Sequence, residues 1–177
     1  MPTREETVEI LKKSIEWNRH GIDVPTYIHS VRVGELLKKH GFSEDVQYAG
    51  LLHDIVEDGW YSFEKLKELG YSNRTIELVD LSTFDMELGD SKQAWVKMME
   101  RLILVDDKEA WAVKLADIAD NLTECHHCEH GRAAGYLFRN APIFIYYGNK
   151  YFAGTDLYNQ FLETYWDQVR RYHNYFQ

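Results

Sequence analysis

The sequence predicts an all-α protein, folded as one helical bundle of about eight or nine helices. Apolar residues recur at helical spacing in nearly every segment, and no stretch alternates apolar and polar residues as a strand would. A chain of 177 residues with 45% hydrophobic residues is long enough to bury a sizeable core. No repeat, low-complexity stretch or linker divides it, so we expect a single domain over residues 1–177.

The individual helices are predicted from apolar periodicity and from residues that favour helix ends. Pro25 suits a first helical turn and Gly41 suits the position after a last turn, so these two residues bound the second helix. Ser43 can cap the third helix, and Asp106 with Glu109 matches a capping box. The predicted helices cover residues 3–18, 25–40, 43–58, 62–70, 72–81, 91–104, 106–122 and 155–172.

Composition limits the partners and the location of the protein. The chain has 20 Lys and Arg against 29 Asp and Glu, a net charge of −9. Nucleic acids and anionic membranes are bound by basic faces, so we expect neither partner. Two cysteines are too few for a disulfide framework, which favours the cytoplasm. The charged N-terminal stretch MPTREETVEILKKS predicts no signal peptide, and no apolar run predicts a transmembrane segment.

Ionisable residues crowd one stretch of the third predicted helix, LLHDIVEDG. His53 and Glu57 are one turn apart, Asp54 and Asp58 form the adjacent stripe, and apolar residues take the opposite arc. A solvated polar face is the simplest interpretation for such a helix in isolation. His29 argues against a purely solvated face, because it lies within the apolar stripe of the second helix. A histidine at such a position is either a buried core residue or a metal ligand.

A later segment, VKLADIADNL, repeats the pattern with Asp117 and Asn121 one turn apart. The imidazoles of His29 and His53 and the carboxylates of Asp54 and Asp117 make a plausible ligand set for one divalent cation, such as Mn²⁺, Fe²⁺, Mg²⁺, Co²⁺ or Zn²⁺. Burying these charges without a cation would be costly. The sequence therefore predicts that three helices pack side by side and bring the four side chains together.

The order H…HD…D of these four residues resembles the HD superfamily of metal-dependent phosphohydrolases. The string HDIVED resembles the HDxxED motif of (p)ppGpp hydrolases, and PTYIHSVRVGELL, YAGLLHDIVEDG and KMMERLILVDDKEAWAVKLADIADNL resemble the segments around that family's motifs. The resemblance covers residues 15–122, and residues 123–177 form a predicted helical extension. It implies a hydrolase that acts on a nucleotide or a related phosphorylated small molecule.

The resemblance also implies roles for single residues. His29, His53, Asp54 and Asp117 become the ligands of one metal ion, for which Mn²⁺ is the expected identity. Three residues are the candidates for catalysis: Glu57 and Asp58, which would handle the attacking water and its proton, and Asn121, which would assist beside the last ligand. Four basic residues are candidates for contact with the substrate: Arg32, Lys114, Arg19 and His20.

The sequence departs from the (p)ppGpp hydrolases at the positions that contact the substrate in that family. RHGIDVP replaces the basic loop before the first histidine, and Thr123 and Glu124 stand where that family has an arginine and a threonine. The expected class is therefore a metal-dependent phosphohydrolase, with (p)ppGpp as one candidate substrate. A 5′-nucleotidase or other phosphomonoesterase of the same superfamily is an alternative, and so is a non-catalytic regulator that binds a metal or a nucleotide.

The C-terminal region carries two further features. CHHCEH, from Cys125 to His130, could hold zinc, but a polar loop beside the cleft is the favoured interpretation of residues 126–135. Residues 136–151 are ambiguous because Pro142 interrupts their helical pattern. The aromatic residues of IFIYYGNKYF and LYNQFLETYWDQVRRYHNYF are expected in the core. A homodimer interface is the alternative, and stacking on a base is a third option.

Overall fold

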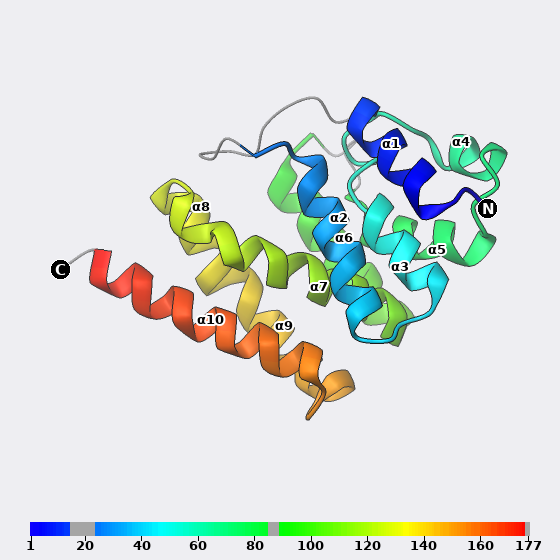
Figure 1. Cartoon of the computed structure of the whole chain (residues 1–177). Helices are drawn as coiled ribbons and strands as arrows, with labels where there is room; N and C mark the ends of the chain where they lie inside the picture. Colours follow the sequence, from blue (N-terminus) through cyan, green and yellow to red (C-terminus); the bar gives the residue numbers. More distant parts are fainter. Residues whose placement is uncertain (15–23, 85–88, 176–177) are drawn as a thin grey trace.

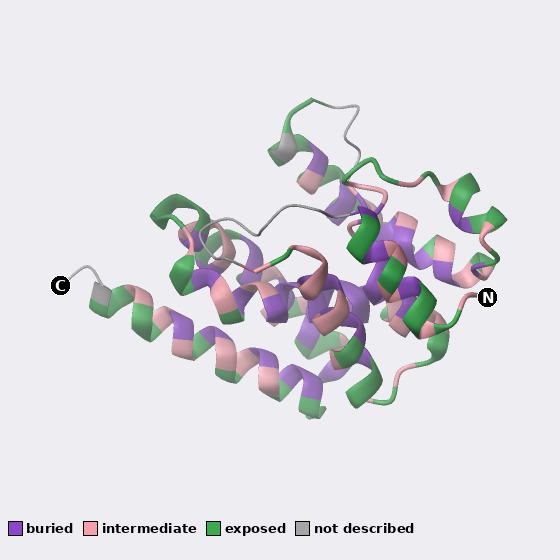
Figure 2. Ribbon diagram, turned by 45° about the horizontal axis from the view of Figure 1, so that its top comes forward, coloured by how far each residue is buried: buried purple, intermediate pink, exposed green. Residues whose placement is uncertain are grey.

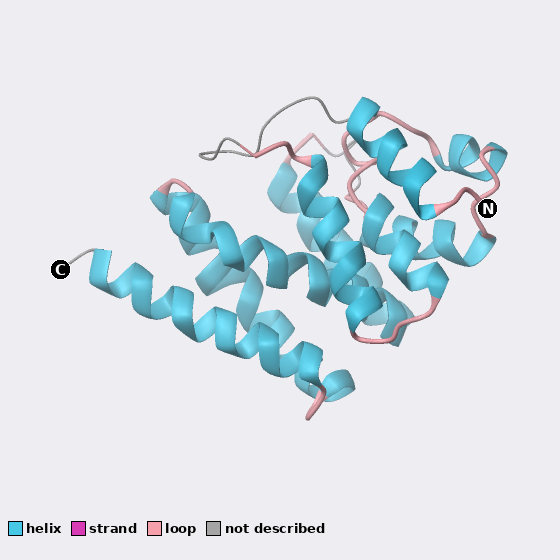
Figure 3. Cartoon of the chain, in the orientation of Figure 1, coloured by secondary structure: helices cyan, strands magenta, loops and turns pink. Residues whose placement is uncertain are grey.

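The computed structural model describes residues 1–14, 24–84 and 89–175 (Figure 1). Within these ranges the chain consists of helices and connecting loops, without a β-strand (Figure 3). This arrangement confirms the predicted all-α fold. None of the described helices combines the length and the apolar composition needed to cross a bilayer.

The helices follow the predicted order along the chain. Their bounds are α1 (Arg4–Ser14), α2 (Tyr27–Lys39), α3 (Glu44–Leu52), α4 (Phe63–Glu68), α5 (Asn73–Ser82), α6 (Ser91–Val105), α7 (Lys108–Glu124), α8 (His130–Ala134), α9 (Ala141–Phe152) and α10 (Asp156–Tyr175). A short 3₁₀ turn, η2 (Cys125–His127), precedes α8, and a π-helical turn, η3 (Gly135–Asn140), follows it. Positions 15–18 of the first predicted helix lie outside the described residues.

Helix α7 lies at the centre of the molecule. It packs against α2, α3 and α5 on one side and against α9 and α10 on the other (Figure 1). Nearly every residue from Ala110 to Leu122 is buried, as expected for a helix that is surrounded by others. Figure 2 shows buried residues concentrated where these helices meet. A polar side chain on α7 is therefore either enclosed or directed into a cavity.

Two glycines allow α2 and α3 to approach each other closely. A Cβ atom at Gly34 would lie 2.7 Å from Cγ of Leu51, and one at Gly50 would lie 2.5 Å from Cδ1 of Leu37. Both distances are shorter than the Cβ contacts of real structures, so a side chain at either position would force the neighbouring leucine to move. The close approach brings His29 on α2 next to the residue that follows α3.

The third helix ends earlier than predicted. Helix α3 stops at Leu52, and the stretch HDIVED continues as a series of tight turns rather than as regular helix to Asp58. Nδ1 of His53 donates to the carbonyl oxygen of Gly50 at 2.8 Å, an acceptor that the amide of Asp54 would use in a continued α-helix. The amide of Ile55 bonds to Leu52 at 3.0 Å in the tighter i→i−3 pattern.

The cap of the central helix also differs from the prediction. Oδ1 of Asp107, not the side chain of Asp106, accepts from the amides of Glu109 and Ala110 at 2.8 and 3.2 Å. Asp106 has a left-handed backbone, with φ of 57°, and terminates α6. Asp106 thus ends α6 and Asp107 caps α7. A capping-box pattern alone does not reveal that two adjacent aspartates have these separate roles.

Residues 126–135 are partly helical, contrary to the predicted loop, because they contain α8 and the last two residues of η2. The ambiguous residues 136–151 resolve into η3 and α9, with Pro142 in the first turn of α9, directly after the π-helical turn. The aromatic residues beyond them contribute to the core as expected, for example Tyr158, Phe161 and Tyr165 on α10. A homodimer remains a prediction.

Candidate active site

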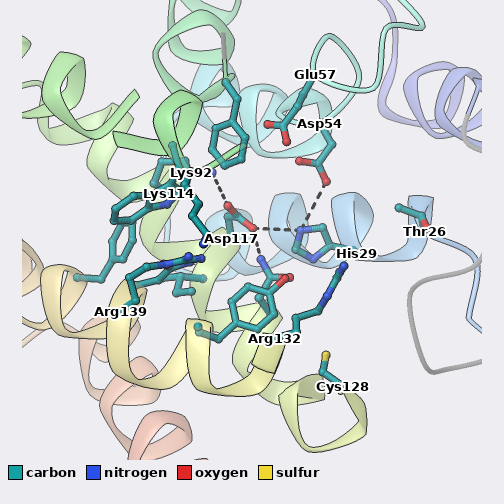
Figure 4. A pocket seen from close by; sticks show the side chains of 18 of the residues that line it. Thr26, His29, Asp54, Glu57, Lys92, Lys114, Asp117, Cys128, Arg132 and Arg139 are labelled. Atoms are coloured by element: carbon teal, nitrogen blue, oxygen red, sulfur yellow. Dashed lines mark hydrogen bonds and ion pairs between the residues drawn. The ribbon is translucent and has the colours of Figure 1, made fainter. Parts of the chain in front are cut away.

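The four predicted ligand side chains lie close together, although they come from α2, the turns after α3, and α7. Figure 4 shows three of them, His29, Asp54 and Asp117. The Nε2 atom of His29 lies 3.2 Å from Nε2 of His53 and 3.2 Å from Oδ1 of Asp117. Nε2 of His53 lies 3.1 Å from Oδ1 of Asp54 and 3.6 Å from Oδ1 of Asp117. The two Nε2 atoms thus mark a common centre, which Asp54 and Asp117 both approach. Among the described residues, the ligand atoms of His29, His53 and Asp54 lie within 4.8 Å of one another, and Asp117 is not part of that group.

Both imidazole rings are oriented by a bond to their other nitrogen. Nδ1 of His29 lies 2.6 Å from Oδ2 of Asp120, and Nδ1 of His53 bonds to the backbone of Gly50. Both histidines are buried. With each Nδ1 atom occupied in this way, both Nε2 atoms are available at the common centre, which is the arrangement typical of metal-binding histidines.

Asp120 connects His29 to a second layer of charges. The guanidinium of Arg32 donates to both carboxylate oxygens of Asp120, at 2.7 and 2.9 Å, and to Glu124 at 2.5 Å. Burial would raise the pKa of Asp120, but His29 and Arg32 outweigh it and hold this pKa below its usual value. Arg32 was predicted to contact the substrate, yet it is not among the residues that line the cavity described below. Its contacts indicate a positioning role behind His29.

Asp117 receives hydrogen bonds on both of its oxygens. Nζ of Lys114 lies 2.5 Å from Oδ2, and Nδ2 of Asn121 donates to Oδ1 at the same distance. Burial alone would raise the pKa of Asp117, but Lys114 and the two histidines lower it well below its ordinary value. Asp117 is therefore ionised, with Oδ1 turned toward the common centre.

The carboxylates also change the charge state of the neighbouring imidazole. Burial favours the neutral form of His53, but Asp54 and Asp117 overcome this effect and raise its pKa to about 9. The acidic groups at the centre thus attract positive charge, whether it is carried by protons or by a cation. His29, His53 and Asp54 each offer one ligand atom, all within 4.8 Å of one another, so the described residues can hold a divalent metal ion here.

Glu57 and Asp58 lie beside this centre, on the turns that follow Asp54. Burial and the adjacent charge of Asp54 raise the pKa of Glu57 to about 8 and the pKa of Asp58 to about 6. Carboxyl groups with such pKa values can exchange a proton near neutral pH, as acid–base catalysis requires.

A cavity of about 530 Å³ opens at the centre, a size typical of small-molecule sites. Asp54, Glu57 and Asp58 lie in its wall together with His29, Lys114, Asp117 and Asn121. Other lining residues were not recognised in the sequence: Phe84, Lys92, Trp95, Arg132, Tyr136, Arg139, Asn140 and Phe144. Five of these, from Arg132 to Phe144, belong to the segment from α8 to α9, outside the stretch that carried the family resemblance.

The remaining sequence-based candidates have different outcomes. Arg19 and His20 lie outside the described residues. Cys128 lines the cavity, as expected for a segment beside the cleft, whereas Cys125 is buried and its Sγ bonds to Gln168 at 3.3 Å. The described residues show no cysteine-containing group arranged to hold a metal, so the zinc interpretation of CHHCEH gains no support.

Comparison with known proteins identifies the class. The family model for the HD domain matches residues 26–122, more than half of the chain, and the chain belongs to this family. The match confirms the resemblance carried by the histidine and aspartate pattern. It ends before η2, so the helices that form the far wall of the cavity lie beyond it.

The proteins that are similar to this chain include one from Synechocystis and one metazoan protein of known structure. A probable guanosine-3′,5′-bis(diphosphate) 3′-pyrophosphohydrolase from Synechocystis is 34% identical over 102 residues, which are 55% of this chain. The chain spans only 13% of the length of that relative. A solved structure described as a metazoan ortholog of SpoT that hydrolyses ppGpp has a TM-score of 0.76, with 23% identity over 95% of this chain and 97% of the other. The second likeness supports the fold.

Proposed function

We propose that this protein is a divalent-metal-dependent phosphohydrolase that cleaves a phosphate ester or anhydride of a nucleotide. A 3′-pyrophosphohydrolase activity on (p)ppGpp is the first candidate, because both similar proteins are described as acting on this nucleotide. The observation that carries the proposal is the convergence of His29, His53, Asp54 and Asp117 at the end of a cavity whose wall also holds Glu57 and Asp58.

The four converging residues suit a single divalent cation. Two imidazole nitrogens and two carboxylates match borderline and hard ions, and we propose Mn²⁺ ahead of Fe²⁺, Mg²⁺, Co²⁺ and Zn²⁺. When bound, such an ion would polarise a phosphoryl oxygen and acidify water. The chain itself would orient the histidines through Asp120 and Gly50 and fix Asp117 through Lys114 and Asn121.

Glu57 is the proposed general base. The pKa of Glu57 is raised to about 8 without a cation, and a positive ion nearby would lower this pKa toward neutral pH. The ionised carboxylate could then take a proton from the attacking water. Asp58 is one residue further along the same turns and could hold or pass on that proton. Lys114 remains charged, because Asp117 and Glu57 raise its pKa against the effect of burial, and its charge would favour a phosphoryl group at this end of the cavity.

A hydrolysis screen tests this proposal. The full chain is incubated with Mn²⁺ and a panel of compounds: guanosine 3′,5′-bis(diphosphate), guanosine 5′-diphosphate, which lacks the 3′ phosphates, and common nucleotides. The products are then separated by chromatography. Release of pyrophosphate supports the alarmone-type reaction, whereas release of orthophosphate from monophosphates supports the phosphomonoesterase alternative. No turnover of any compound by metal-loaded protein would leave the regulator alternative in place and contradict the enzymatic proposal.

A further inference from the structure

The segment CHHCEH holds both cysteines of the chain, Cys125 and Cys128, three positions apart. Both are free thiols. Cys125 begins the 3₁₀ turn η2, and the amide of Cys128 donates to the carbonyl oxygen of Cys125 at 3.1 Å, which closes the turn. The described residues show no metal-binding group that contains either sulfur, and the proposed hydrolysis does not use them.

The closed turn holds the two cysteines at a separation that a disulfide can bridge. One turn of a 3₁₀ helix contains three residues and rises about 6 Å, so the Cα atoms of Cys125 and Cys128 lie roughly that far apart. Disulfides most often join Cα atoms about 5.5–6 Å apart. The backbone of η2 therefore meets the distance requirement of a disulfide as it stands.

The two thiols differ in accessibility. Cys125 is buried, and its Sγ atom donates to Oε1 of Gln168 at 3.3 Å. Burial, reinforced by the nearby Cys128, raises the pKa of Cys125 to about 12, so this group is a protonated thiol at neutral pH. Cys128 is half-buried and lines the cavity. A reagent that enters the cavity thus meets Cys128 first, with Cys125 behind it.

The surroundings of Cys128 leave its sulfur able to react. Its Sγ atom lies 3.9 Å from the carbonyl oxygen of Glu124, which is a long contact even for sulfur. Figure 4 shows this sulfur directed toward the side chains that line the cavity. Arg132 lines the same cavity four positions further along the chain, and a guanidinium near a thiol favours the nucleophilic thiolate.

We propose that Cys125 and Cys128 are a redox-active pair, which a small-molecule disulfide such as oxidised glutathione converts to an intramolecular disulfide in the wall of the cavity. The Cys128 thiolate attacks one sulfur of the reagent, and the glutathione thiolate that leaves takes up the proton that Cys128 lost. The Cys125 thiol then attacks the Cys128 sulfur of the mixed disulfide, and its proton leaves with the second glutathione. Two protein thiols are oxidised, and one reagent disulfide is reduced to two thiols.

The disulfide would alter the wall of the cavity. Bonding to the buried Cys125 draws the sulfur of Cys128 away from the lining and replaces the hydrogen bond between Cys125 and Gln168 on α10. Helix α8 begins two residues after Cys128, so a covalent link across η2 ties the start of α8 to the end of α7. We therefore expect oxidation to restrict local opening of residues 125–134.

Equilibration of the full chain with glutathione tests the pair. Reduced protein is incubated in buffers of increasing oxidised glutathione, remaining thiols are alkylated, and each species is weighed by mass spectrometry. We expect both thiols to be lost together, with a mass lower by two hydrogen atoms and no retained glutathione, and dithiothreitol should restore both. A mixed disulfide that persists on the unmodified chain, the loss of one thiol alone, or a cross-link between two chains would overturn the proposal.

Single substitutions separate the roles of the two sulfurs. Cys125→Ser should stop at a mixed disulfide between Cys128 and glutathione. Cys128→Ser, the matched control, should react at least about tenfold more slowly, because its remaining thiol is buried and protonated. Equal rates for the two variants would contradict the order of attack. Circular dichroism of each variant shows whether the fold is retained.

Hydrogen–deuterium exchange measures the effect on the wall of the cavity. Peptides that cover residues 125–134 should exchange at least about threefold more slowly in the oxidised chain than in the reduced chain, whereas peptides from α1 should be unchanged. Unchanged exchange of residues 125–134 in fully oxidised protein would reject the link to the wall. None of these readouts uses turnover, so the dithiol and the hydrolase can be rejected separately.

Discussion

The Nε2 atoms of His29 and His53 lie 3.2 Å apart, although the residues belong to different helical segments and are separated by 24 positions. Two imidazole nitrogens at this distance must share a proton or a cation. Because the Nδ1 atoms are bound to Asp120 and Gly50, the rings are fixed with their Nε2 atoms facing each other and the carboxylates. This single contact links the packing of α2 on α3 to the proposed chemistry.

The first prediction concerns Asp120, which orients His29 without lying at the common centre. Asp120→Asn removes the charge that fixes the imidazole and leaves Arg32 with a weaker partner. We expect affinity for Mn²⁺ to fall by about 10- to 100-fold, as for other residues that support a ligating histidine. Competition with a fluorescent chelator measures this affinity. Asp167→Asn, at the surface of α10, is the control, and equal affinities in both variants would contradict the positioning role.

The second prediction separates catalysis from metal binding. Glu57→Gln preserves the size of the side chain but removes the proton acceptor. Turnover should fall by about a hundredfold to ten-thousandfold, while the metal content measured by elemental analysis stays the same. Glu64→Gln, on the exposed side of α4, should have no effect on either quantity. Undiminished turnover in Glu57→Gln would show that another group accepts the proton.

The third prediction concerns the pH dependence of stability at the cap of α7. Burial would raise the pKa of Asp107, but Arg74 and the amides of Glu109 and Ala110 hold it below its usual value of 3.8. A carboxylate with a lowered folded-state pKa stabilises the protein fully above its unfolded-state pKa, and this contribution disappears as the pH falls through the folded-state pKa. Asp107→Ala should therefore cost about 1 kcal/mol at neutral pH.

Chemical denaturation at several pH values measures this cost. The difference between Asp107→Ala and the unmodified chain should be constant from pH 7 to about pH 5 and should shrink below pH 4. Asp107→Asn, which keeps an acceptor oxygen but loses the charge, should lie between the two proteins. A difference that grows as the pH falls would contradict this explanation.

The fourth prediction concerns the contact between α2 and α3. Gly34→Ala places a Cβ atom 2.7 Å from Cγ of the buried Leu51. We expect a net loss of stability, because overpacking costs about 1–3 kcal/mol and the better helix propensity of alanine returns about 1 kcal/mol at most. Gly131→Ala on α8, where a new Cβ would meet no atom within 4 Å, should not be destabilised. Equal unfolding midpoints for the two variants would refute the close-packing argument.

The sequence was sufficient to predict which side chains lie together at the candidate metal centre. His29 stood out because it interrupts an apolar stripe, and Asp54 and Asp117 stood out because they recur beside apolar arcs of other helices. Such signals depend on local spacing, which one sequence displays directly. The end of α3 at Leu52 was not predictable in the same way, because the side chain of His53 competes for a helical carbonyl and periodicity contains no trace of this competition.

The far wall of the cavity was not predictable from local patterns. Trp95 lies on a predicted helix, Arg132 in the segment predicted as a loop, and Arg139 in the segment whose helical pattern Pro142 interrupts. They line one cavity only because elements far apart in the sequence pack together. Arg32 illustrates the opposite case. Its position near His29 in the sequence suggested contact with the substrate, but Asp120 and Glu124, which are about ninety positions away, bind it behind the histidine.

Anomalous diffraction from crystals of the full chain grown with Mn²⁺ tests the central claim most directly. We predict one strong peak per chain at coordination distance from Nε2 of His29 and His53 and from one oxygen each of Asp54 and Asp117. The absence of a peak among these atoms, or a peak held by other residues, would contradict it.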